Sequence, residues 1–419
     1  MASALRLRLG TAGEHDTPGG SGFVGSAFAS AVRLPVPDRV LVAAVGGTLV
    51  GLLADFRLDA APVSELIPVT QHAANAGREV HFEQLVGWHG IVWILGFLVL
   101  LRSRAHWRQL FTAPAILMMG VAVAIPIVAA ATAEIDSLTV ESLLGVGLPL
   151  ACMTAVVLHP AVSRHALWIS IWLLAATTGL LIAATVAKAA LSGSIPRLGI
   201  AFFGPTTSTG PVLAALALMV LLGLPPKGRP RALGIALFIV LVAGVGLTQS
   251  RGSAVALLVG LGVVGLLSRN VPGRAVALTG LFAVAVLVIA PRSLLAAGEA
   301  NNVRAQSLSY HWRLFLEQPS LGYGVSKGTL SASAGAHNSV LAVALGTGAY
   351  GAVAFVGAWV STLVGAARQD LVLGSSVFAT YLVGWVLTGG EVLFQIPVTN
   401  LLPLALACAV TKRAGSPPP

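Results

Sequence analysis

Residues 113–131 have the sequence APAILMMGVAVAIPIVAAA, a run without a charged side chain. At the 1.5 Å rise per residue of an α-helix, a run of this length covers about 30 Å, the thickness of the hydrocarbon core of a bilayer. A helix that is apolar on every side has no face suited to water. The stretch therefore predicts a transmembrane helix.

Runs of the same character recur along the chain and predict twelve spans. Several are shorter than the ideal of about 20 residues, so a short one could instead re-enter the membrane from one side. The predicted bounds are 40–56, 85–101, 113–131, 139–159, 167–187, 206–224, 232–248, 253–267, 275–290, 339–364, 374–390 and 396–411.

The composition of the 419-residue chain points the same way. Hydrophobic residues make up 56% of it and charged residues 10%, and the mean hydropathy is +0.88. A soluble domain carries about 25% charged residues, so this chain has too little charge to cover a water-exposed surface. We expect an all-α polytopic membrane protein, in which Cys152 and Cys408 are small core residues because both lie inside apolar runs.

The formal charge of +10 is a topology signal rather than a nucleic-acid signal. With the N-terminus in the cytoplasm, most Lys and Arg residues fall in predicted cytoplasmic segments and most acidic residues on the opposite side, as expected for membrane proteins. This orientation puts both termini in the cytoplasm. The predicted organisation is a flexible tail over 1–38, one transmembrane domain over 39–412 and a second tail over 413–419.

The longest predicted external connection is 291–338, and a helix is expected in it over 304–317, ending before Pro319. Its apolar side chains fall largely on one side, so this helix should lie along the membrane interface, with Trp312 at headgroup depth. These side chains are Leu308, Trp312, Phe315 and Leu316.

Two polar segments frame that helix. A turn is predicted at Gly322-Tyr323-Gly324, and His337 and Asn338 stand directly before the next span. The segment 248–253, TQSRGS, is a polar turn between the apolar arms of a predicted hairpin. Its guanidinium, on Arg251, can bind a phosphate with two hydrogen bonds and stays charged at any relevant pH.

Three segments in order resemble the O-antigen ligase and Wzy-type polymerase family of bacterial membrane glycosyltransferases. They are TQSRGSAVALLVGLGVVGLL (248–267), RAQSLSYHWRLFLEQPSLGYG (304–324) and AHNSVLAVALGTGAYGAVAF (336–355). The resemblance covers roughly residues 248–356 by motif. Residues 1–247 match only in hydropathy and number of spans.

The resemblance implies a GT-C-like architecture and metal-independent transfer of a glycan from a polyprenyl-diphosphate carrier to an acceptor hydroxyl. The reaction would take place on the outer face of the bacterial cytoplasmic membrane, in cell-surface polysaccharide assembly. The acceptor would be a glycan, a lipid or a protein. No cofactor, metal ion or nucleic acid is expected.

Three positions match the family's functional residues. Arg251 matches the Arg of a Ser-Arg-Gly turn, Arg304 matches the Arg that opens the loop helix, and His337 matches the His of a His-Asn pair. The aromatic residue usually found four positions after the loop arginine is Leu308 here, so Arg313 is the alternative to Arg304.

The chemistry of these side chains suits the reaction. Guanidinium groups can stabilise a diphosphate leaving group without a metal, so Arg251 and Arg304 would hold it. A neutral imidazole can take the proton of an acceptor hydroxyl, so His337 would be the general base. The remaining candidate substrate-binding residues are Arg313, Asn338, Ser250 and Gln249.

Simpler interpretations exist for each residue. Arg251 could be an anchor at the end of a span, either loop arginine could face solvent, and His337 could cap the following helix. The main alternative function is a transporter or a flippase for lipid-linked glycans, and a membrane scaffold is a third. Transporters tend to place ionisable residues at the bilayer midplane, whereas here the polar residues gather at one face.

Overall fold

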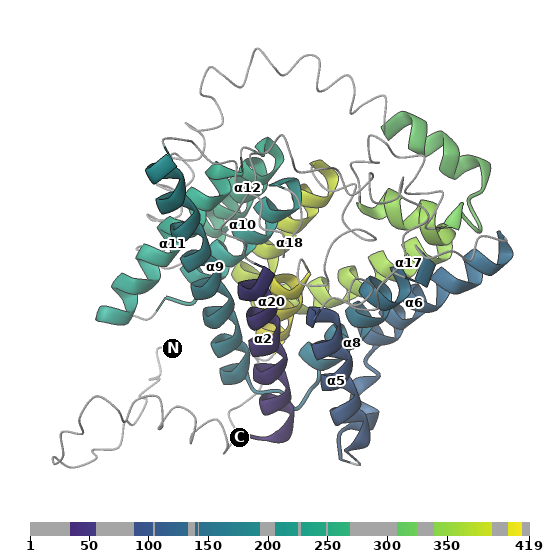
Figure 1. Ribbon diagram of the computed structural model, residues 1–419, viewed down its shortest axis with the longest axis horizontal. Coiled ribbons are helices and arrows are strands. Elements are labelled where there is room, and N and C mark those ends of the chain that lie inside the picture. Colours follow the sequence, from purple (N-terminus) through teal and green to yellow (C-terminus); the bar gives the residue numbers. More distant parts are fainter. Residues whose placement is uncertain are drawn as a thin grey trace, which may run out of the picture.

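The computed structural model describes residues 34–55, 88–103, 105–132, 139–140, 142–192, 206–224, 228–248, 250–268, 308–324, 339–387 and 401–412. These residues form helices joined by turns, and no strand occurs among them. The all-α prediction is therefore confirmed for this part of the chain (Figure 1).

The helices follow one another with short connections. They are α2 (Val36–Asp55), α5 (Trp88–Arg102), the 3₁₀ turn η2 (Trp107–Leu110), α6 (Ala113–Ala131), the π-helical η3 (Ser142–Gly147), α8 (Leu148–Val157), α9 (Arg164–Ser192), α10 (Thr206–Leu222), α11 (Arg229–Leu247), α12 (Arg251–Leu267), a helix over 308–317, α17 (Ser339–Gln369), α18 (Leu371–Leu387) and α20 (Leu402–Lys412).

Helix is found in each predicted span except 275–290, which lies outside the described residues. Four segments are long and apolar enough to cross a membrane: Ala113–Ala131, Arg164–Lys188, Arg229–Leu247 and Val340–Ala366. The other apolar helices are shorter, so the count of twelve spans stays a prediction. Helix α2 begins at Val36, inside the predicted tail, because Pro37 suits the first turn of a helix.

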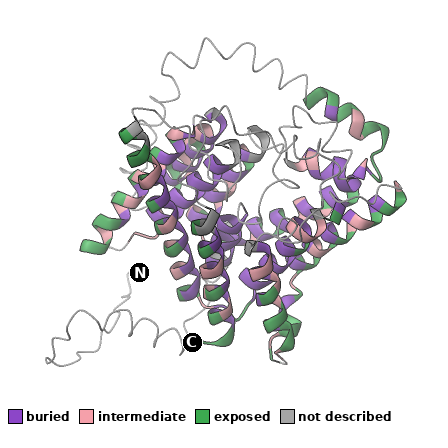
Figure 2. Ribbon diagram, in the orientation of Figure 1, coloured by how far each residue is buried: buried purple, intermediate pink, exposed green. Residues whose placement is uncertain are grey.

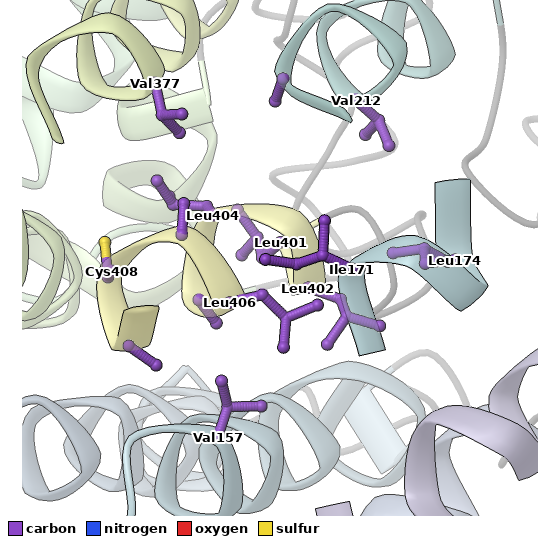
Figure 3. Packing of buried hydrophobic residues seen from close by; sticks show 14 of the residues in the cluster. Val157, Ile171, Leu174, Val212, Val377, Leu401, Leu402, Leu404, Leu406 and Cys408 are labelled. Carbon is purple, nitrogen blue, oxygen red and sulfur yellow. The ribbon is translucent and has the colours of Figure 1, made fainter. Parts of the chain in front are cut away.

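Two helices form the centre of the molecule. Every residue of α10 from 209 to 221 is buried, and so is every residue from 401 to 410 around α20 (Figure 2). Helix α20 contacts α8, α9, α10, α17 and α18. Figure 3 shows its Leu402, Leu404 and Leu406 among apolar side chains of these neighbours, such as Val157 and Ile171. The remaining helices surround this pair.

The predicted hairpin of the helices before and after the turn 248–250 is wrong in one respect. Helices α11 and α12 make few contacts with each other, whereas α10 packs extensively against both. Sequence neighbours are separated here because glycines let α10 approach both partners closely: a Cβ on Gly244 of α11 would meet Ile182 and Leu213 side chains, and one on Gly210 of α10 would overlap Ser253 of α12.

Helices α17 and α18 are joined by a single non-helical residue, Asp370. Its backbone N–H bonds the carbonyl of Ala366, and its carboxylate accepts the backbone N–H of Leu373 at 3.0 Å, which caps the start of α18. The two helices also pack against each other. They therefore run in opposite directions from this link.

Candidate functional site

The polar turn 248–250 prepares the start of α12. The hydroxyl of Thr248 donates to the carbonyl of Val245 at 2.7 Å and accepts the backbone N–H of Ser250 at 3.3 Å. Ser250 is the N-cap of α12, and its Oγ accepts the backbone N–H of Ser253 at 3.4 Å. The turn is thus held by its own hydroxyl groups, and Arg251 is the first residue of the helix.

This turn lies in a junction of three helices. Thr248 and Ser253 face Gly210 at the start of α10, where no Cβ could fit between them. The next residue of α10, Pro211, contacts Gly384 near the end of α18, since a Cβ there would lie 2.9 Å from the proline Cβ. The starts of α10 and α12 and the end of α18 therefore meet, a region named here the α10–α12–α18 junction.

The direction of α17 follows from this junction. Helix α18 ends there, and it packs along α12, with Gly260 of α12 against Thr380 of α18. Because α17 and α18 run in opposite directions from Asp370, α17 begins at the same end of the bundle as the junction. The starts of α12 and α17, which follow Ser250 and Asn338 in the sequence, thus share one end.

The helix 308–317 has two different faces. His311 is 2% exposed, and Leu314 and Phe315 are partly buried against Leu341 and Leu345 of α17. The prediction that Phe315 shares the apolar stripe is wrong, because its ring packs inward onto α17. The exposed apolar stripe is Leu308, Trp312 and Leu316, at i, i+4 and i+8.

Arg313 lies next to this stripe and is exposed. Trp312, 51% exposed, leans on Phe315 with ring centroids 5.6 Å apart. In Figure 1 the helix is the green segment at the upper right, above α17. It presents a guanidinium and an indole outward while its inner face holds it to the start of α17.

The predicted turn at residues 322–324 is confirmed, and it docks on a break in α17. Gly322 and Gly324 have φ of 67° and 76°. Inside α17, Gly348 has φ 70° and ψ −177°, a conformation open almost only to glycine. The backbone N–H of Tyr323 donates to the carbonyl of Leu345 at 2.7 Å, and the N–H of Ala349 donates to the carbonyl of Pro319 at 2.8 Å.

Tyr323 makes a second contact within the turn. Its hydroxyl donates to Oε2 of Glu317, at the end of the helix 308–317, at 2.9 Å. Burial of the phenol, followed by this hydrogen bond and the charge of Glu317, raises the pKa of Tyr323 above its usual 10.0. The neutral phenol is the form that bridges the helix end and the turn.

The predicted site residues are described to different extents. Ser250 is the cap of α12, Arg251 is its first residue, with its side chain outside the described part, and Arg313 is exposed on the loop helix. The structure brings the Arg313 helix onto the start of α17, which follows the His-Asn pair. The remaining predicted residues, Gln249, Arg304, His337 and Asn338, lie outside the described residues.

Sequence reasoning missed three residues of this region. His311 is buried on the inner face of the loop helix, with its ring 5.3 Å from that of Tyr310. Ser253 is fully buried, and its Oγ has no hydrogen-bond partner. Gly348 breaks α17. Its only signal was the pair Gly346 and Gly348 within an apolar run.

A second polar cluster lies where α2, η2 and the α8–α9 connection meet. Oδ1 of the buried Asp38 accepts the backbone N–H of Ser163 at 2.6 Å, and Ser163 caps α9 through its Oγ and Ala166. The ring of the buried His159 lies 5.5 Å from that of His106 and accepts the N–H of Ala161 at Nδ1. This accepted hydrogen bond requires the neutral imidazole, so the cluster ties helix ends together.

Cys152 and Cys408 are buried free cysteines, as expected of small core residues. Across the described ranges, no three His, Cys, Asp or Glu side chains gather where a metal ion could be held. Neither the comparison with models of known protein families nor the search of curated proteins gives a match to this chain.

Proposed function

We propose that the chain is a membrane glycosyltransferase of the O-antigen ligase or polymerase type, with twelve spans and a GT-C-like arrangement. It transfers a glycan from a polyprenyl-diphosphate carrier to an acceptor hydroxyl on the outer face of the bacterial cytoplasmic membrane. Both termini are cytoplasmic. In this proposal Arg251 and a loop arginine, Arg304 or Arg313, hold the diphosphate, and His337 is the general base.

The observation that carries the proposal is the common end of α12 and α17. The Ser250–Arg251 turn begins α12, the His-Asn pair directly precedes α17, and both helices begin at the same end of the bundle. The helix with Arg313 packs on the first turns of α17. Three segments that lie far apart in the sequence are thereby directed to one side of the molecule.

The distribution of charge supports chemistry at that side over passage through the membrane. In the named helices, every Asp, Glu, Lys and Arg lies within about five residues of a helix end. A transporter more often holds ionisable residues at the bilayer midplane, in interrupted helices. The one described interruption of α17, at Gly348, is filled by a backbone turn and carries no ionisable side chain.

The residues would act in a simple order. A guanidinium at the start of α12 adds to the positive end of the helix dipole, so a diphosphate there meets a positive potential before any bond changes. As the glycosidic bond to the carrier breaks, the leaving diphosphate gains charge, which the arginines stabilise. His337 takes the proton of the attacking hydroxyl.

The test is reconstitution in vesicles with a labelled polyprenyl-diphosphate glycan. Label on a new acceptor indicates a ligase, a longer carrier-linked glycan indicates a polymerase, and relocation without transfer indicates a flippase. Arg251→Ala should lower the rate by about 10²–10³-fold and His337→Ala by about 10²–10⁴-fold. Arg368→Ala, at the far end of α17, is the control that keeps full activity.

The choice between the two loop arginines is part of the same experiment. Arg304→Ala and Arg313→Ala are compared at equal expression, and the arginine that binds the donor is the one whose loss raises the donor KM or lowers kcat. Full turnover by Arg251→Ala and His337→Ala would refute the assignment of the site, and bare relocation of the lipid would refute the enzyme.

A further inference from the structure

The break in α17 has an unusual hydrogen-bond pattern. In an unbroken helix the N–H of Ala349 would donate to the carbonyl of Leu345, four residues earlier. Here the two groups bind the loop turn instead: Leu345 accepts from Tyr323, and Ala349 donates to Pro319. One helical hydrogen bond is thus replaced by two, and the turn 319–323 is inserted in the gap.

Both sides of this insertion require glycine. A Cβ on Gly348 would overlap the backbone of Ser320, and one on Gly322 would lie 2.8 Å from the carbonyl of Ala344 and close to that of Leu345. Both residues also have positive φ, which disfavours any side chain. Backbone presses on backbone at both points, so no rotamer change of a neighbour could make room.

The insertion joins three pieces into one unit. The turn is continuous with the helix 308–317, and Tyr323 ties it back to Glu317. Leu314, Phe315 and Tyr323 pack on Leu341 and Leu345, so the first half of α17 is held on both its backbone and its side chains. The orientation of residues 339–347 is therefore set by the loop and not by the second half of α17.

We propose that Gly348, Gly322 and the backbone of Tyr323 are positioning residues, an inference that rests on the proposed function. They hold the first half of α17, which follows His337 and Asn338 directly in the sequence, at a defined angle to the helix that carries Arg313. They do not touch the substrate. The donor-binding turn at Ser250 and Arg251 belongs to the α10–α12–α18 junction and does not contact this unit in the described structure.

The structural part of the test needs no activity. Nitroxide labels at Ser309→Cys on the loop helix and Val353→Cys on the second half of α17 report the spacing of the two pieces, since both sites are exposed and Cys152 and Cys408 are buried. The unmodified chain should give one narrow distance distribution. Gly348→Ala and Gly322→Ala should broaden and shift it.

Gly357→Ala is the matched control in the same helix. Its Cβ would meet only Leu117 Cδ1, at an ordinary 3.6 Å, so it should leave the spacing unchanged. Should both glycine variants fail to fold, amide hydrogen exchange on the unmodified chain decides. Protection of the N–H groups of Tyr323 and Ala349 is expected, and exchange at the rate of unprotected amides would overturn the insertion.

The kinetic part tests positioning. Gly348→Ala should lower kcat for glycan transfer by about 10²-fold, the effect of a displacement of about 1 Å, while the donor KM changes less than about twofold. A shifted spacing with unchanged kcat would overturn the positioning role. No transfer by the unmodified chain would overturn the proposed function and this role together, while the label spacing would still decide whether the turn holds α17.

Discussion

Replacing Gly210 by Ala probes the α10–α12–α18 junction at its tightest point. The new methyl group would overlap Oγ and Cβ of Ser253 and lie 3.3 Å from Oγ1 of Thr248. Both partners are fully buried and belong to the turn that begins α12. The side chains have no free space to rotate into, so the two helices must separate.

The magnitude follows from two opposed terms. Overpacking of a close contact destabilises by about 1–3 kcal/mol, while Ala in place of Gly favours a helix by about 1 kcal/mol. The net loss of stability is up to about 2 kcal/mol. A shift of the Arg251 turn on the order of 1 Å should lower glycan transfer by about 10²-fold. Activity is therefore expected to suffer more than folding.

The assay combines thermal unfolding, followed by tryptophan fluorescence, with glycan transfer in vesicles. Gly262→Ala is the control, since a Cβ there meets no atom within 4 Å and the same helix propensity is gained. Adding Ser253→Gly to Gly210→Ala removes both overlapping atoms and should restore transfer. If Gly210→Ala behaves like Gly262→Ala in both assays, the close contact does not position the turn.

Three further outcomes are expected. Asp38→Ala leaves the N–H of Ser163 without its buried acceptor and should lower thermal stability by about 1–3 kcal/mol, with Asp38→Asn losing less; equal effects would show that the hydrogen bond at 2.6 Å contributes nothing. A fluorophore at Leu316→Cys should be quenched by lipids with a spin label in their chains, whereas one at Glu317→Cys should not, because only the first lies on the exposed apolar stripe; equal quenching contradicts an interfacial helix. The raised pKa of Tyr323 means that its hydrogen bond to Glu317 is present below pH 10.0 and lost as the pH rises through the raised value, so protection of the turn should fall only in alkali, and Tyr323→Phe should abolish that pH dependence.

The helical class and the positions of the helices could be predicted because hydropathy is a local property. A run such as 113–131 is apolar whatever it packs against, and it is helical in the structure. The turn at Gly322–Gly324 was predictable for the same reason, since glycine alone adopts its positive φ at no steric cost. The pairing of helices was not, as the misplaced hairpin of α11 and α12 shows.

The candidate site divides in the same way. The residue types that suit a diphosphate and an acceptor hydroxyl were visible in the order of the motifs, and the cap at Ser250 follows from its own turn. The inward face of Phe315 was not visible, because helical periodicity groups it with Trp312 and Leu316 and only contact with Leu341 and Leu345 separates it from them.

The sequence by itself determined that this chain is built of apolar helices with polar residues at their ends, because side-chain hydropathy and glycine content need no partner to act. Only the tertiary structure decided which helices touch, that α10 separates α11 from α12, and that a loop turn fills the break at Gly348. The physical reason is that lipid chains and helix surfaces are almost equally apolar, so hydropathy cannot specify a neighbour. Close contacts of glycine and backbone hydrogen bonds make that choice, and both depend on residues far apart in the chain.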